Sequence, residues 1–159
     1  MRWLAAQGHL PQGVDRNTEA IALAQAFGQV TCADIENGPW PFAGQTFGCV
    51  VVTHYLWRPL LPSIVQAVAP GGVLIYETFA AGNESVGKRS RPDFLLQPGE
   101  LLKATEGLRV VAYEDGFEAS PDRFVQRIAA VRPVTSGEVK RWSLRPELGN
   151  TGFTRTIRV

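Results

Sequence analysis

The fold class of this 159-residue chain is decided by one stretch, Phe47-Gly48-Cys49-Val50-Val51-Val52-Thr53. Its residues are apolar or β-branched, and polar residues do not alternate with them. A strand of this composition is typical of a parallel sheet that is covered on both faces. We therefore predict a central β-strand over residues 47–53.

Strand and helix patterns alternate on both sides of this stretch. Downstream, residues 60–68 have apolar residues at helical spacing, and the Pro70-Gly71-Gly72 breaker leads into a second buried strand over residues 73–79. Upstream, a short strand ends at Asp15, a helix begins near Asn17 or Thr18, and another strand covers residues 30–35. This order predicts an α/β fold built from strand-helix-strand units.

The end of the pattern is different. Residues 108–114 and 124–131 both have strand composition, and the turn-rich stretch between them has no room for a helix. We predict an antiparallel hairpin that closes the sheet, in a single domain over residues 1–133. Residues 134–159 are more polar and end in an alternating segment, which predicts a C-terminal arm or edge strand.

Composition excludes several classes of protein. Sixteen Lys and Arg against 15 Asp and Glu give a net charge of +1, so nucleic acid is not the expected partner. No apolar run approaches the ~18 residues of a membrane span, and the first residues do not resemble a signal peptide, so we expect a cytoplasmic protein with no membrane partner. Two cysteines and two histidines at unrelated spacings predict no metal site.

The order of these motifs resembles the class I S-adenosylmethionine-dependent methyltransferases over about residues 1–132. The matching features are strands that end near Asp15 and Asp34, the buried residues 50–53, Pro70-Gly71-Gly72 before a strand, and the closing hairpin. The resemblance implies a Rossmann-like, mostly parallel sheet with a C-terminal antiparallel hairpin. It also implies S-adenosylmethionine as cofactor and methyl transfer as the reaction. The methyl acceptor is expected to be a small molecule, because the chain has neither a basic stripe nor a separate docking domain.

The resemblance also implies a difference. In that family a first strand and a glycine-rich loop precede the segment with which this chain begins, so we expect a sheet that is incomplete at the N-terminus. The flanking strands could pair directly, the C-terminal arm could insert, or a second copy could complete the sheet, and we favour a homodimer. The alternative function is a non-catalytic methyltransferase-like scaffold or oligomerisation module that has lost cofactor binding.

The resemblance implies cofactor-binding roles for residues at two strand ends. Asp15 would accept hydrogen bonds from the ribose hydroxyls, as acids do after this strand in dinucleotide folds. Asp34 would accept from the adenine amine, and Ile35 would pack on the ring. The alternatives are that Asp15 caps the next helix and that Asp34 forms a turn before Asn37.

Three further residues, Thr53, His54 and Tyr55, lie at the carboxyl edge of the central strand, where open α/β sheets bind ligands. We expect Thr53 to contact the cofactor, and His54 and Tyr55 to face the methyl acceptor. His54 would act as a base only if the nucleophile arrives protonated. Its alternative is a loop histidine stacked beside Tyr55 and Trp57.

Glu77 is an acid inside the apolar strand of residues 73–79, near the same edge. Desolvation there would raise its pKa, which makes it a third candidate catalytic residue on the acceptor side. The alternative is a structural ion pair with Arg58, Arg89 or Arg91.

Overall fold

The computed structural model describes residues 1–86 and 91–134. The strands are β1 (Gln12–Asp15), β2 (Gln29–Cys32), β3 (Phe47–Thr53), β4 (Val68–Phe79), β5 (Arg109–Glu118) and β6 (Arg123–Val131). The α-helices are α1 (Arg2–Ala6), α2 (Thr18–Ala24), α3 (Leu61–Gln66) and α4 (Glu100–Ala104). Short 3-10 turns are η1 (Gln25–Phe27), η2 (Arg58–Leu60), η3 (Asn83–Ser85) and η4 (Pro92–Phe94).

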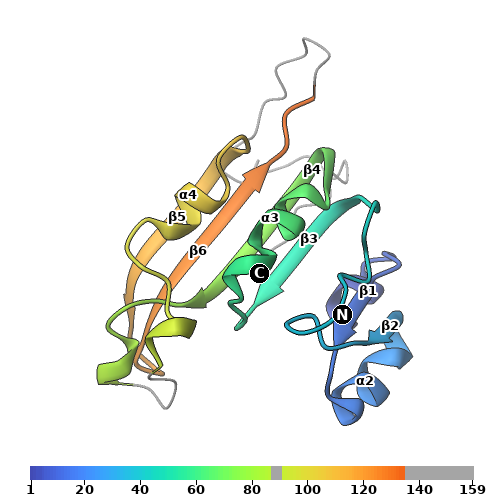
Figure 1. Ribbon diagram of the computed structural model, residues 1–159, viewed down its shortest axis with the longest axis horizontal. Coiled ribbons are helices and arrows are strands. Elements are labelled where there is room, and N and C mark those ends of the chain that lie inside the picture. Colours follow the sequence, from blue (N-terminus) through green and yellow to red (C-terminus); the bar gives the residue numbers. More distant parts are fainter. Residues whose placement is uncertain (87–90, 135–159) are drawn as a thin grey trace, which may run out of the picture.

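The strands form two sheets. The larger has the order β3-β4-β6-β5, in which β3 and β4 are parallel and β6 is antiparallel to both of its neighbours. The smaller is the parallel pair β1-β2, which lies with α2 beside β3 in Figure 1. The predicted α/β fold class, with its strand-helix-strand units and closing antiparallel hairpin, is confirmed.

The hydrophobic core lies between the four-stranded sheet and the helices α3 and α4, which cover one face of it (Figure 1). Along β4, alternate residues such as Leu74 and Tyr76 are buried against this helical layer, as the two-residue period of a strand requires. Ile64 of α3 and Leu101 of α4 pack against them. The core therefore fixes one face of β4 and leaves Glu77 on the opposite face.

In the described part of the chain β3 is an edge strand, which corrects the prediction of a central strand. It forms a hydrogen-bonded ladder with β4 alone, and Val51 in its middle is 42% exposed. Within residues 1–86 and 91–134 no strand pairs with its other side, because β1 and β2 pair with each other in a sheet of their own. The composition of β3 is that of a central strand, whereas its hydrogen bonding is that of an edge.

Two strand boundaries differ from the predictions. β2 ends at Cys32, so Asp34 lies in the turn that follows, and β4 already begins at Val68. The glycine of the breaker next to Val73 is required by packing, because a Cβ at Gly72 would lie 2.8 Å from the carbonyl oxygen of Ala69. The arm predicted for residues 134–159 lies, apart from its first residue, outside the described residues.

Within the described ranges no helix is long and apolar enough to cross a lipid bilayer.

Candidate functional site

The carboxyl ends of β1 and β2 bring the two predicted acidic residues to one edge. Asp15, the last residue of β1, is the register partner of Cys32, the last residue of β2. The chain continues from β2 with the Ala33 amide donating to the carbonyl oxygen of Asp15 at 3.0 Å. Asp34 follows directly, so it lies beside the end of β1.

Asp15 bonds to the residue that caps the next helix, α2. Its Oδ1 accepts a hydrogen bond from the backbone N–H of Asn17 at 2.8 Å. Asn17 in turn caps α2, since its Oδ1 accepts from the amides of Glu19 and Ala20. The predicted capping role of Asp15 is therefore indirect. Asp15 bonds to Asn17, and Asn17 is the residue that caps α2. The exposed carboxylate keeps its second oxygen, Oδ2, without a hydrogen bond from any described residue.

Asp34 forms a compact turn. Its Oδ1 accepts from the amides of Glu36 and Asn37, at 3.0 and 3.3 Å, and its Oδ2 accepts from the Asn37 side chain at 2.9 Å. The Asn37 side chain and then the Glu36 amide lower the pKa of Asp34 from its ordinary value. This is the turn-forming alternative. Ile35, directly after it, is partly buried and packs against the main core.

The carboxyl end of β3 supplies Thr53 and His54. Thr53 is exposed and pairs with Glu77 in the ladder. His54 has a backbone φ of +54°, in the left-handed region, and its N–H donates to the carbonyl oxygen of Glu77 at 2.9 Å. Its ring lies 5.5 Å from that of Phe79. The ring of His54 therefore has an aromatic neighbour from β4, which the sequence analysis did not foresee.

Tyr55 follows and points into a different environment. Its hydroxyl oxygen is buried and has no hydrogen-bond partner among the described residues. Burial, and after it the charges of Glu36 and Asp34, raise the pKa of Tyr55 to about 12, while Arg16 acts in the opposite direction. The hydroxyl is thus protonated at neutral pH and lies within electrostatic reach of the turn after β2.

Glu77 lies in an ion-pair network on the open face of the sheet. Its carboxylate bonds Arg127 at 2.5 Å and Arg123 at 3.4 Å, and its side chain is 15% exposed. Arg127 also binds Glu114 and Glu118. This is the predicted structural alternative for Glu77, with arginines of β6 in place of those named from the sequence. The ladder explains the partner, because β6 places Arg127 directly opposite Glu77.

The sequence analysis named Arg58 only as a possible partner of Glu77 and missed its role as a structural anchor. Arg58 binds both carboxylate oxygens of Glu100, at 2.7 and 2.9 Å, and donates to the carbonyl oxygens of Asp93 and Leu95. It fastens the segment before α4 to the turn after Tyr55. The only sequence signal was an arginine at the edge of a predicted ligand site, because its partner is 42 residues away.

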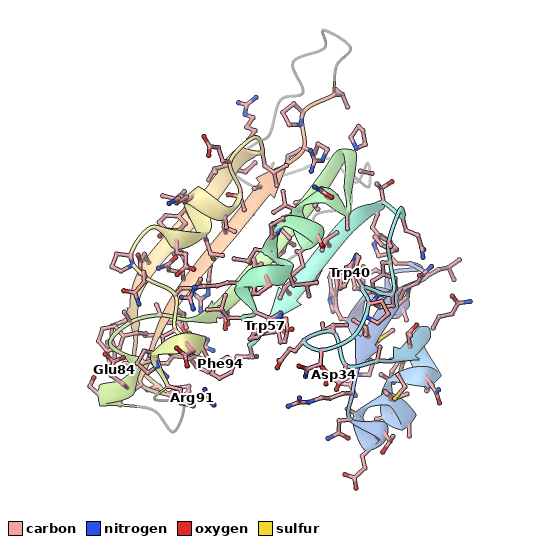
Figure 2. The ribbon with its side chains drawn as sticks, in the orientation of Figure 1. Asp34, Trp40, Trp57, Glu84, Arg91 and Phe94 are labelled. Carbon is pink, nitrogen blue, oxygen red and sulfur yellow. The ribbon has the colours of Figure 1, made fainter. Side chains whose placement is uncertain are left out.

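Aromatic side chains surround the same edge. Trp40 and Trp57 are partly buried against the core, and Figure 2 shows Trp57 near the end of β3, with Trp40 and Asp34 on the neighbouring side toward β1 and β2. Trp40 stacks edge-on against Phe42, with 5.1 Å between ring centroids. No group of three His, Cys, Asp or Glu side chains within the described residues is arranged to hold a metal ion.

The fold is shared with solved structures of low sequence identity. TehB from Haemophilus influenzae superposes with a TM-score of 0.62 at 15% identity, over 82% of this chain and 52% of TehB. A S-adenosylmethionine-dependent methyltransferase from Mesorhizobium loti gives 0.62 at 18% identity, over 82% and 84% of the two chains. The fold is that of the class I methyltransferases.

A third similar structure contains a ligand. The N-methyltransferase NodS from Bradyrhizobium japonicum, in complex with S-adenosylhomocysteine, has a TM-score of 0.58 at 18% identity, over 77% of this chain and 66% of NodS. The chain spans about half the length of TehB. No protein-family model and no curated protein sequence matches it. These likenesses establish the methyltransferase fold.

Proposed function

We propose that the protein is an S-adenosylmethionine-dependent methyltransferase that acts on a small molecule. The observation that carries this proposal is the methyltransferase fold together with two acids, Asp15 and Asp34, at one edge of its parallel strands. Open α/β sheets bind ligands outside the carboxyl ends of their strands. The open carboxylate oxygen of Asp15 lies at the end of β1, and Tyr55 with its buried hydroxyl follows the end of β3.

The residues at this edge fit the nucleoside half of the cofactor. Asp15 is the better of the two acids for this role, because one of its oxygens is open to accept from ribose hydroxyls. Asp34 uses both oxygens in its own turn, so its part is to fix the turn and to place Ile35. Ile35 offers an apolar surface, and Thr53 an exposed hydroxyl, from the two sides of the edge.

S-adenosylmethionine, when bound, supplies a methyl group on a positively charged sulfur, which leaves readily in an in-line displacement. The task of the protein is then to hold the acceptor in line and to exclude water. His54 is the residue placed to take a proton from an acceptor that arrives protonated. Its backbone is left-handed, and its ring lies beside that of Phe79.

A second candidate function is the non-catalytic scaffold. The observation that favours it is the local use of the acids, because the Asp34 carboxylate is fully engaged within its own turn. In this case Asp34 would serve only to stabilise its own turn, and this edge of the strands would bind no cofactor.

Thermal unfolding of the full chain with S-adenosylhomocysteine separates the two functions. A ligand at 100 times its Kd stabilises by ~2.7 kcal/mol, which raises Tm by roughly 5–10 °C in a chain of this size. Asp15→Asn keeps an oxygen for the Asn17 amide but loses the charge, and we expect it to weaken binding about 3- to 10-fold. Asp122→Asn, in the exposed hairpin turn, is the matched control and should bind normally. A Tm that stays constant at millimolar ligand would overturn the methyltransferase proposal.

A further inference from the structure

Two tyrosines beside the candidate site differ in the state of their hydroxyl groups. Tyr76 of β4 is 1% exposed, and its hydroxyl donates to the backbone carbonyl oxygen of Tyr55 at 2.8 Å. The hydroxyl of Tyr55 is also buried, but no described residue accepts its proton or donates to it. One phenol is therefore part of the fold, and the other is left unpaired next to it.

An unpaired buried hydroxyl is unfavourable for the folded state. Its transfer from water is not compensated by a hydrogen bond, so it destabilises the folded state. Phenylalanine would fill the same space without that cost. Groups of this kind are expected where function rather than stability decides the residue.

The surroundings of the hydroxyl indicate what would bond to it. Tyr55 packs against the same core as Ile35 and Trp40, so a partner there would meet apolar and aromatic surface. Glu36 and Asp34 act on the phenol electrostatically, each more strongly than the opposing Arg16, and the balance of negative charge disfavours an anionic partner. A protonated phenol is a hydrogen-bond donor, so the fitting partner is an uncharged acceptor such as a ring nitrogen or a hydroxyl oxygen.

We propose that the Tyr55 hydroxyl donates a hydrogen bond to an uncharged acceptor atom of the bound nucleoside. Tyr55 then contacts the cofactor from the β3 side, opposite the turn that carries Asp34 and Ile35. This inference rests on the proposed function. It moves Tyr55 from the acceptor side, where the sequence analysis placed it, to the nucleoside side of the edge.

The test compares Tyr55→Phe with Tyr76→Phe in the full chain, by thermal unfolding and by titration with S-adenosylhomocysteine. Tyr55→Phe removes the unpaired group, so we expect Tm without ligand to rise by about 2–4 °C. The same variant should bind S-adenosylhomocysteine about 3- to 10-fold more weakly, because it lacks the donor. Tyr76→Phe leaves a backbone carbonyl without its partner, and its Tm should fall.

The outcomes distinguish this inference from the proposed function. If the wild-type chain binds S-adenosylhomocysteine and Tyr55→Phe binds equally well, the inference is wrong while the proposed function stands. If Tyr55→Phe lowers Tm, the hydroxyl supports the fold and the inference is also wrong. If the wild-type chain does not bind the ligand at all, the proposed function fails and the inference fails with it.

Discussion

Arg58 and Glu100 lie 42 residues apart in the sequence and form a bidentate ion pair, with N–O distances of 2.7 and 2.9 Å. Burial alone would raise the pKa of Glu100, but the hydrogen bond from Arg58 and that from the Gln97 amide lower it on balance. The same guanidinium donates to two backbone carbonyl oxygens. This arrangement joins the turn after the candidate site to the start of α4.

Replacement of Arg58 should therefore destabilise the protein. Arg58→Ala removes four hydrogen bonds and leaves the Glu100 carboxylate, which is 18% exposed, without its partner. Because the Arg58 side chain is itself 39% exposed, we expect a loss of about 1.5–3 kcal/mol in urea unfolding rather than the larger cost of a fully buried pair.

The matched control is Arg91→Ala. Arg91 pairs with Asp93 at 3.2 Å, and both side chains are more than 70% exposed, at 73% and 75%. Solvent-exposed pairs contribute little, so the loss should stay below about 1 kcal/mol. Equal losses in the two variants would contradict the anchoring role of Arg58.

Glu77 gives a second prediction. Glu77→Gln removes the charge that faces Arg123 and Arg127, and we expect about 1–2 kcal/mol of lost stability with unchanged affinity for S-adenosylhomocysteine. Glu114→Gln is the control, because Glu114 binds the same Arg127 but is 69% exposed. A Glu77→Gln variant of normal stability that no longer binds the ligand would instead support a role for Glu77 in the site.

The raised pKa values of the tyrosines predict how the stability of the folded protein changes in alkaline solution. All three have raised pKa values, and burial is the first cause for each. The folded state favours the neutral phenol, so this contribution to the stability of the fold is fully present below the unfolded pKa of about 10. It is lost as the pH rises through the pKa values of the folded state, which is about 12 for Tyr55. Absorbance at 295 nm should show delayed tyrosine ionisation in the folded protein. Ionisation near pH 10 before any unfolding would contradict this prediction.

The homodimer expected from the sequence stays a prediction, and the two edges of the four-stranded sheet support it. β3 is uncharged along its whole length, whereas β5 at the other edge carries charged residues, which protect a strand from pairing. We expect sedimentation to show a dimer that Val51→Lys dissociates. Val110→Lys on β5, where Val110 is 39% exposed, should remain dimeric. A monomeric wild-type chain would refute the dimer.

Local patterns made much of the fold predictable. The β-branched run over residues 47–53 gave the bounds of β3, and the missing helix between residues 114 and 124 correctly indicated the hairpin. The strand predicted over residues 30–35 is shorter, because Asp34 draws the amides of Glu36 and Asn37 into a turn. The Asp34 side chain thus competes with the strand ladder for these backbone amides. The sequence shows this competition only as an aspartate shortly before Asn37-Gly38.

Contacts between residues that lie far apart in the sequence could not be predicted from local patterns. The partner of Glu77 depends on the antiparallel register of β4 and β6, which places Arg127 opposite it, 50 residues along the chain. The edge position of β3 depends on what lies beyond it, which its own composition does not reveal. For the same reason the sequence named Tyr55 as a site residue without indicating that its hydroxyl is buried and unpaired.

The central claim, that this methyltransferase fold binds the methyl donor, is tested most directly by calorimetric titration of the full chain with S-adenosylhomocysteine. We predict saturable binding of one ligand per chain, weakened by Asp15→Asn and unaffected by Asp122→Asn. Absence of heat and of saturation at millimolar ligand, with a folded protein in the cell, would contradict it.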